Sequence, residues 1–544
     1  MIAQKKARSV LLFFICLIVY LIIIINLLYI QIIRHNFFID LGRQQYNVTL
    51  TMQPPRAPIY DCSGKPLAIN ASSLSAFILP HQLEHPEKVS RFLAHYFPSA
   101  YERLQTNSHK FFMFIKRRLK QEELDLIKKQ GLSDIKLVDE PCRFYSERTL
   151  GTIIGITDID NHGLFGIEHM FDGQLSGIPS ICKLERDARS GNFYFNKITN
   201  IEGLSGAPVN LSIDSELQFL VFQELKESIE KFSAKEGGAI IVDPETGEIK
   251  ASVSWPDFDP NDSTQLVQEY TKNFPFTQCY EVGSVIKVFS ATAALEEGVV
   301  TPDELIDCEN KKTTYIDGMK VNTVSAHGII PFSEVIQKTN NIGTAKVAMR
   351  VGTKLYDYYR RFGFAQKTAV NFPGEQIGFI SHPDNWSKRS IISLSFGYEI
   401  RTTMAQLAQA FATISHDGVP VELTLLKNTK KTSALPPIIS KKTINQIKDI
   451  LTKTVLEGTA HRAHIQGYRV MGKTGTANII ENGHYNEHKN LFTFCGIIQK
   501  NTYKRVIVVY IKEIESKRQQ YASTIAVPLF EQVAEKMLIH DRMI

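Results

Sequence analysis

The chain reads Glu281-Val-Gly-Ser-Val-Ile-Lys287 where an apolar, Ala-rich run begins, and that run ends at Gly298. Glycines at both ends suit the start and the stop of a helix. On such a helix Ser284 and Lys287 stand one turn apart on the same face. A buried lysine loses its charge readily and can then take the proton of a serine hydroxyl, while the helix N-terminus favours the anion that forms. The stretch therefore predicts a serine nucleophile, Ser284, with Lys287 as its base.

The Ser-x-x-Lys spacing is weak when it stands alone. The chain contains four matches: Ser133/Lys136, Ser180/Lys183, Ser228/Lys231 and Ser284/Lys287. The simplest interpretation of any one of them is a surface serine beside a solvated lysine. A second motif is needed to distinguish the fourth match from the other three.

Gly472-Lys-Thr-Gly-Thr-Ala477 supplies a sharper motif, because Lys-Thr-Gly occurs once in the chain. One alternative is an ordinary turn, since Gly-Lys-Thr-Gly is typical turn chemistry. Another is a phosphate-binding P-loop, because Gly467 completes the spacing Gly-x4-Gly-Lys-Thr. The four residues after Gly467 are Tyr, Arg, Val and Met, which are bulky for a loop that wraps phosphates, so the sequence disfavours a nucleotide site.

The order of the motifs decides between these interpretations. A serine with a lysine three residues on, followed later by Lys-Thr-Gly, is the layout of penicillin-recognising serine acyl-transferases. That family has Ser-x-Asn between the two. At the expected place the chain has Lys338-Thr-Asn-Asn-Ile-Gly343, which resembles the family's Ser-Ser-Asn-Val-Gly with Thr339 for the motif serine. Threonine keeps the hydroxyl and adds a methyl, so a proton relay through Thr339 is chemically possible.

Further stretches extend the resemblance to most of the chain, which looks like a class B penicillin-binding protein, a monofunctional peptidoglycan D,D-transpeptidase. The matching stretches are 56–68, 142–146 and 163–168 for the pedestal, and 243–248, 256–261 and 395–398 for the transpeptidase part. The chain departs from the family pattern at Ala57 for Gly, Val282 for Pro and Thr339 for Ser.

This resemblance implies an α+β fold of the penicillin-recognising serine transferase type, a central antiparallel sheet flanked by helices, after a transmembrane helix and an elongated β-rich pedestal. The residue pattern agrees. A hairpin is predicted at 238–253 around an Asp-Pro-Glu-Thr-Gly turn, helices at 284–415, and a late strand at 506–512 that closes the sheet. Helical spacing also predicts a helix over 111–130 that stops at Gly131. We expect a tail (1–9), an anchor (10–33), a pedestal (34–205) and a transpeptidase domain (206–544).

The anchor is predicted from residues 10–33, where only Asn26 and Gln31 interrupt an apolar run. A bilayer core of about 30 Å needs about 20 helical residues, and a cleaved signal peptide has a shorter apolar region. Lys5, Lys6 and Arg8 precede the run, so the positive-inside rule predicts a cytoplasmic N-terminus. We therefore expect a single-pass protein of the inner membrane with a periplasmic catalytic domain.

The composition of the chain is that of an ordinary globular protein outside the apolar run at 10–33. The 544 residues carry a net charge of +6 and are 43% hydrophobic, and the positive charge is dispersed, which weakens the case for nucleic acid. His461-x-x-His464 and His484-x-x-x-His488 have a spacing that could hold zinc, but no further ligands complete a site, so solvated histidines are favoured. No metal or cofactor is expected.

The resemblance also implies a substrate and residue roles. The substrate is a stem peptide that ends in D-Ala-D-Ala, and β-lactams mimic that end. Ser284 is the nucleophile and Lys287 its base. The remaining implied site residues are Thr339 and Lys473 for proton transfer, Asn341 for the substrate amide, and Thr474, Gly475 and Thr476 for the substrate carboxylate and the oxyanion hole.

Three questions of function stay open at this point. The enzyme resembles the septal type, which implies a membrane glycosyltransferase and division proteins as partners, but an elongation type is the alternative. A non-catalytic β-lactam-binding scaffold or sensor is a second alternative, because of Thr339. A carboxypeptidase or β-lactamase, with water as the acceptor, is a third.

Overall fold

Two apolar stretches on either side of an Asp-Pro-Glu-Thr-Gly turn form the first hairpin of the main sheet in the computed structural model of the chain. Strand β9 (Ala234–Val242) pairs antiparallel with β10 (Ile249–Trp255). Gly247 closes the turn with a φ of +75°, and a side chain there would collide with the backbone oxygen of Glu422. The hairpin predicted from the sequence is therefore confirmed.

The structure describes residues 2–110, 112–186, 193–267, 270–427, 435–481, 484–514 and 520–544. The chain divides into two units. One consists of Met1–Arg56 with Ser176–Gly206, and the other of Ala57–Leu175 with Ala207–Ile544.

The main sheet belongs to the second unit and has the strand order β10-β9-β19-β18-β17. Strands β17 (Arg469–Glu481), β18 (His484–Lys500) and β19 (Tyr503–Ile514) come from the end of the chain, and β19 pairs antiparallel with β9. The sheet is antiparallel throughout. The late closure expected from residues 506–512 is thus confirmed, and β17 lies at one edge of the sheet.

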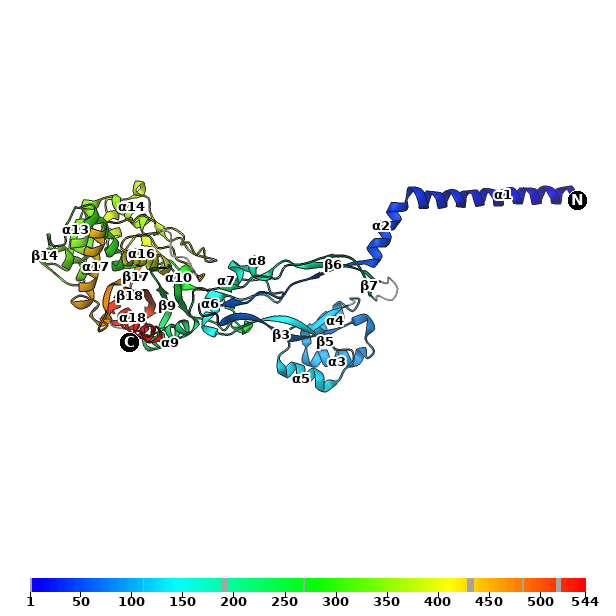
Figure 1. Cartoon of the computed structure of the whole chain (residues 1–544), viewed down its shortest axis with the longest axis horizontal. Coiled ribbons are helices and arrows are strands. Elements are labelled where there is room, and N and C mark those ends of the chain that lie inside the picture. Colours follow the sequence, from blue (N-terminus) through cyan, green and yellow to red (C-terminus); the bar gives the residue numbers. More distant parts are fainter. Residues whose placement is uncertain are drawn as a thin grey trace. The chain divides into compact units, whose positions relative to one another are not determined.

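Helices cover both faces of this sheet (Figure 1). Alternate strand residues point to opposite sides. Ile241 and Val509 pack with α9 (Ser215–Phe232) and α18 (Ala522–His540), whereas Ile240 and Val508 belong to the core on the other side, with α11 (Lys287–Glu296) and α16 (Met404–Ser415). The predicted α+β architecture is confirmed.

Shorter elements complete this part of the chain. The helices are α10 (Phe274–Thr277), α12 (Phe332–Gln337), α13 (Asn341–Val351), α14 (Lys354–Arg361), α15 (Ser390–Ser395) and α17 (Lys441–Leu456). The 3-10 segments are η4 (Ser263–Gln265), η5 (Gly283–Ile286), η6 (Pro383–Asn385) and η7 (His461–Ala463). The strand pairs are β11 (Leu305–Asp307) with β14 (Ile329–Pro331), β12 (Thr313–Ile316) with β13 (Met319–Asn322), and β15 (Phe379–Ile380) with β16 (Ile400–Arg401).

A second sheet has the order β4-β3-β2-β8, with β5 paired to β3. Its strands are β2 (Ile59–Tyr60), β3 (Pro66–Ile78), β4 (Met113–Lys116), β5 (Lys136–Tyr145) and β8 (Val209–Asn210). Its helices and 3-10 segments are η2 (Pro80–Gln82), α3 (Pro86–Tyr96), α4 (Pro98–Thr106), α5 (Gln121–Gln130), η3 (Arg148–Leu150), α6 (Gly151–Ile154), α7 (Gly166–Met170) and α8 (Asp172–Ser176). A buried ion pair, Arg143 with Glu168, joins β5 to α7 at 2.7 Å.

The helix expected over 111–130 is wrong in its first half. Met113 and Ile115 are buried while Phe114 and Lys116 are partly exposed, and this alternation is that of strand β4. Arg118 then turns the chain with a φ of +53°, and α5 begins at Gln121. The predicted stop is confirmed, because Gly131 adopts the left-handed conformation that ends the helix.

The first unit contains α1 (Ile2–Leu28), a π-helical turn η1 (Tyr29–Ile33) and α2 (His35–Tyr46). Its sheet has the order β1-β6-β7, from Asn47–Met52, Ser180–Arg186 and Phe193–Ile201. Residues Val10–Ile33 are exposed throughout and form, among the described residues, the one helix long and apolar enough to cross a membrane. The apolar helix expected at 10–33 is therefore present.

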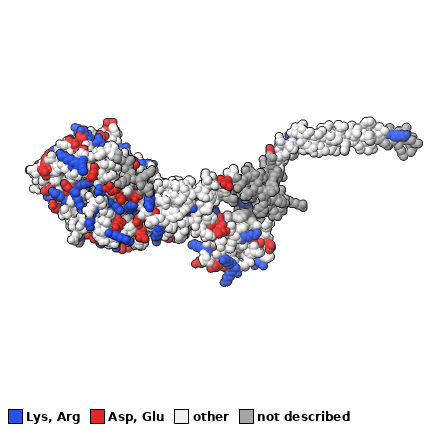
Figure 2. Space-filling model, viewed as in Figure 1, with Lys and Arg blue, Asp and Glu red and all other residues white. Residues whose placement is uncertain are grey.

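Charge is dispersed on the visible surface. Figure 2 shows Lys and Arg side chains interspersed with Asp and Glu over the part that carries the main sheet, without a large area of one sign.

Candidate active site

Ser284 lies in the 3-10 turn η5, and Lys287 is the first residue of α11. The turn packs against edge strand β17 at backbone distance. A side chain at Gly475 would come within 2.3 Å of the backbone oxygen of Val282, and one at Gly283 equally close to that of Thr476. The two glycines therefore let the nucleophile turn and the Lys-Thr-Gly strand approach each other without intervening side chains.

Lys287 is fully buried and donates a 2.8 Å hydrogen bond from Nζ to the backbone oxygen of Thr339. Burial lowers the pKa of Lys287 well below its ordinary value, and the positive charge of Lys473 lowers this pKa further. Both effects favour the neutral amine of Lys287, which is the form that can accept a proton.

Lys473 is also fully buried, in the middle of β17 opposite Cys495 of β18. Its Nζ lies 2.7 Å from Thr339 Oγ1 and 3.1 Å from the backbone oxygen of Thr474. Burial lowers the pKa of Lys473 to about 7. Neither Lys287 nor Lys473 forms an ion pair with a described carboxylate.

Thr339 joins the two lysines, because Lys287 binds its carbonyl group and Lys473 binds its hydroxyl group. Its φ of +59° lies in the left-handed region, which β-branched residues rarely adopt. Strain of this kind persists only where the surroundings fix the conformation. The structure therefore brings together one residue from each of the three predicted motifs.

The two asparagines after Thr339 have different surroundings. Asn340 caps α13, and its side chain accepts a hydrogen bond from the backbone N–H of Gly343 at 2.9 Å. Asn341 donates from Nδ2 to the backbone oxygen of Asn322 at 2.6 Å. Asn341 Oδ1 is buried and accepts no hydrogen bond from any described residue, so it has an acceptor available for another group.

Two of the other predicted site residues, Thr474 and Thr476, already make side-chain hydrogen bonds within the protein, whereas the hydroxyl of Ser284 does not make one with a described residue. Thr474 is buried and shares a 3.1 Å hydrogen bond with the hydroxyl of Thr459, and Thr476 Oγ1 accepts from the backbone N–H of Ala522 at 3.3 Å. Ser284 is half-buried, and its hydroxyl makes no hydrogen bond with a described residue, so no Ser284–Lys287 bond is present. Catalytic hydrogen bonds often form only when substrate is bound.

Sequence reasoning did not assign two neighbours of the site. Thr459 has no motif around it, and it lies between α17 and η7, where its hydroxyl contacts that of Thr474 on β17. Glu281 lies three residues before Ser284, but nothing in the sequence indicates its contacts. Its Oε1 accepts hydrogen bonds from the backbone N–H of Glu399 at 3.0 Å and from the hydroxyl of Tyr485 at 3.3 Å, and burial raises its pKa.

The alternatives for Gly472-Lys-Thr-Gly-Thr-Ala477 are wrong, because this stretch is the interior of a paired β-strand and neither a turn nor a loop that opens a helix. No group of three or more potential metal ligands occurs among the described residues. The side chain of His488 lies outside those residues.

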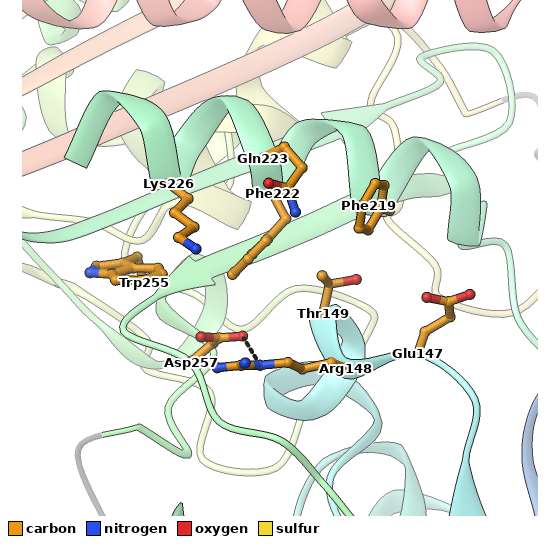
Figure 3. A pocket seen from close by; sticks show the side chains of 9 residues that line it. All are labelled: Glu147, Arg148, Thr149, Phe219, Phe222, Gln223, Lys226, Trp255 and Asp257. Atoms are coloured by element: carbon orange, nitrogen blue, oxygen red, sulfur yellow. Dashed lines mark ion pairs between the residues drawn. The ribbon is translucent and has the colours of Figure 1, made fainter. Parts of the chain in front are cut away.

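A cavity of about 170 Å³ lies away from these residues, at the β10 edge of the main sheet, the opposite edge from β17 (Figure 3). It is lined by Glu147, Arg148, Thr149, Phe219, Phe222, Gln223, Lys226, Trp255 and Asp257. Both signs of charge surround its aromatic walls, and none of the predicted site residues lines it.

Two family models match the chain. The penicillin binding protein transpeptidase domain matches residues 237–535, which is more than half of the chain, and the penicillin-binding protein dimerisation domain matches residues 51–211.

Curated relatives match almost end to end. The probable peptidoglycan D,D-transpeptidase PbpC of Pseudomonas aeruginosa is 30% identical, over 93% of this chain and 90% of its own length. The peptidoglycan D,D-transpeptidase FtsI of Escherichia coli K12 is 27% identical, over 92% and 86%. Penicillin-binding protein 3 of Mycobacterium tuberculosis, solved with aztreonam, shares the fold with a TM-score of 0.69 at 23% identity, over 91% of this chain and 97% of its own. The chain therefore belongs to the class B penicillin-binding proteins, in which a dimerisation domain accompanies a transpeptidase domain.

Proposed function

We propose that the chain is a peptidoglycan D,D-transpeptidase that works through an acyl-serine. Ser284 Oγ attacks the carbonyl carbon of the penultimate D-Ala of a stem peptide while Lys287 Nζ takes the hydroxyl proton. The bond to the terminal D-Ala breaks, and the departing amine receives a proton through Thr339 and Lys473. Backbone N–H groups of Ser284 and Thr476 stabilise the oxyanion, a contribution typically of about 3–4 kcal/mol for each donor.

The second half of the reaction forms the crosslink. An amine of a neighbouring stem peptide attacks the ester carbonyl of the acyl-serine, loses a proton and releases Ser284. Asn341 Oδ1, which accepts no hydrogen bond from described residues, receives one from the substrate amide. Thr474, Gly475 and Thr476 of β17 lie beside the bound stem peptide. Lys473 attracts the terminal carboxylate of that peptide. A β-lactam presents the same carbonyl and carboxylate and acylates Ser284 without prompt release.

One observation favours a catalytic transpeptidase over a non-catalytic β-lactam-binding scaffold or sensor. A single residue, Thr339, links two fully buried lysines whose pKa values are both lowered by burial. Burying two ammonium groups without a described carboxylate partner destabilises a fold, and binding a ligand alone does not require it. A proton-transfer site requires lysines that lose their charge near neutral pH.

Labelling with a fluorescent penicillin, together with turnover of a D-Ala-D-Ala thioester mimic, tests the proposal. Ser284→Ala abolishes both, and a covalently labelled S284A protein would overturn the assignment. Ser133→Ala, in a second Ser-x-x-Lys match, is the control and retains both. Products formed with and without an added amine distinguish the transpeptidase from a carboxypeptidase or β-lactamase, which transfer the acyl group to water.

The proposed organisation is a cytoplasmic tail (1–9), one membrane-spanning helix (10–33), a pedestal (34–205) and a periplasmic transpeptidase domain (206–544) in the inner membrane. Basic residues Lys5, Lys6 and Arg8 before the apolar helix support this orientation. A single cysteine placed in either flank of a chain whose seven native cysteines are replaced by serine, labelled from outside with a membrane-impermeant maleimide, tests it: only the C-terminal flank reacts.

We place the enzyme in septal wall synthesis, beside a membrane glycosyltransferase and division proteins. The relative FtsI and the pedestal motifs at 56–68 support this role. If depletion of the protein makes cells grow as filaments, the enzyme acts in septal wall synthesis. Rounded cells would instead indicate a role in elongation.

A further inference from the structure

Glu281 precedes the nucleophile by three residues, and its carboxylate is where three separate segments of the chain meet. One oxygen, Oε1, accepts hydrogen bonds from the backbone N–H of Glu399 and from the hydroxyl of Tyr485. No ion pair engages Glu281 within the described part of the chain. The carboxylate therefore acts on its neighbours as a hydrogen-bond acceptor.

The first segment that Glu281 holds is the turn after α15. Glu399 has a φ of +60°, and Gly397 in the same turn approaches the nucleophile turn so closely that a side chain would lie 2.0 Å from the backbone oxygen of Gly283. This contact and the hydrogen bond from Glu399 to Glu281 fix the same turn at two points. Displacement of this turn would therefore also move Gly283, the residue immediately before Ser284.

The second segment is the hairpin of β17 and β18. Tyr485 lies near the start of β18, and its ring packs edge-on against Tyr398 at 5.1 Å. The same hairpin carries Lys473 and Thr476 on β17, where Gly475 lies against the backbone of Val282, and the backbone of Thr476 lies against Gly283 of the nucleophile turn. The hydrogen bond between Tyr485 and Glu281 adds a contact between hairpin and nucleophile segment beyond these glycines.

From this geometry we infer that Glu281 is a positioning residue for the reaction, holding the β17–β18 hairpin and the 395–399 turn against the segment that carries Ser284. This inference rests on the proposed acylation of Ser284. Glu281 acts through Tyr485 and through the backbone of Glu399, and it exchanges no proton with the substrate. Loss of the Glu281 carboxylate lowers the rate of acylation because strand β17 is no longer held at a fixed position relative to Ser284.

A double-mutant cycle on the full chain in detergent tests this, with the second-order rate of acylation by a fluorescent penicillin as the readout. We expect Tyr485→Phe to lower the rate about threefold to tenfold, the effect of one hydrogen bond. We expect Glu281→Ala to lower it more, because two donors lose their acceptor. Glu281→Gln retains an acceptor oxygen and restores most of the rate. Adding Y485F to E281A lowers the rate no further.

Tyr315→Phe is the matched control, because Tyr315 is 70% exposed and makes no hydrogen bond with a described residue. Thermal unfolding of every variant shows whether it is folded, and Y485F keeps the test valid if E281A is not. Additive effects of E281A and Y485F, or an unchanged rate in Y485F, would overturn the inference. Labelling of S284A would instead overturn the proposed function, so the two failures are distinguishable.

Discussion

Lys473 Nζ lies 2.7 Å from Thr339 Oγ1, at the position where the family pattern has a serine. The extra methyl group of threonine therefore leaves the hydroxyl within hydrogen-bond distance of the lysine. The left-handed backbone of Thr339 at the same time directs its carbonyl group to Lys287. One residue thus connects the lysine of the first motif with the lysine of the third.

Thr339→Val tests the hydroxyl while it preserves the β-branched shape. Without the hydroxyl no proton passes between the leaving amine and Lys473, and such a group typically contributes about 10²-fold or more to a rate. We expect T339V to lower thioester turnover by at least that much. Thr339→Ser keeps the hydroxyl and retains the parent rate. If T339V turned over as fast as T339S, the hydroxyl would have no part in proton transfer.

Gly475→Ala tests the close approach of β17 to the nucleophile turn. The added Cβ would lie 2.3 Å from the backbone oxygen of Val282. A backbone oxygen cannot move aside by a side-chain rotation. We expect the strand to shift, which lowers the acylation rate about 10²-fold, as misplacement of reacting groups by about 1 Å does. Gly173→Ala is the control, because no atom lies within 4 Å of the place that its added methyl group would take. Equal rates in G475A and G173A would contradict the prediction.

Local sequence patterns predicted the parts of the fold that local physics decides. The hairpin at 238–253 followed from apolar stretches around a turn, and the order of motifs from Ser284 to Lys473 led to the family. Helical spacing failed at 111–130, because a short apolar run such as 113–115 does not by itself distinguish a strand from a helix. The burial of Met113 and Ile115, with Phe114 between them partly exposed, is the alternation of a strand. The turn interpretation of Gly472-Lys-Thr-Gly-Thr-Ala477 failed because pairing with β18 is a long-range contact.

Contacts between distant segments could not be predicted from the sequence. The hydrogen bond between Thr459 and Thr474, and that between Glu281 and Tyr485, join residues with no shared motif. Thr339 was assigned by its place in the motif, but its left-handed backbone and its two lysine partners depend on how α12 and α13 pack around it. The motifs thus predicted Lys287, Thr339 and Lys473, which the structure brings together, and tertiary packing determines how they are connected.

The acylation rate should depend on pH in both directions. As pH rises, the neutral form of Lys287 becomes more populated, because burial and the charge of Lys473 lower its pKa, and the rate increases. Above about 7 Lys473 loses its proton as well, and with it the positive charge that attracts the substrate carboxylate, so the rate decreases. Acylation by a penicillin, measured from about pH 5 to about pH 9.5, should give a bell-shaped profile.

A penicillin methyl ester is the control for the alkaline side of this profile. Its carboxylate is blocked, so neutralising Lys473 removes no attraction, and the decrease above about pH 7 should be smaller than for the free penicillin. Any decrease that remains reports the loss of Lys473 as a proton donor to the leaving amine. A free penicillin whose rate stayed constant above that pH would show that the charge of Lys473 does not assist binding.

Glu168→Gln should destabilise the part of the chain that contains β5 and α7. The side chains of Arg143 and Glu168 are 1% and 0% exposed, and removing one charge leaves the other buried without its partner. Such a loss typically costs about 3–5 kcal/mol. Asp449→Asn is the matched control, because its ion pair with Arg469 is exposed and such pairs contribute about 0–1 kcal/mol. Unfolding in urea, followed by tryptophan fluorescence and by circular dichroism, measures both, and equal midpoints for E168Q and D449N would contradict the prediction.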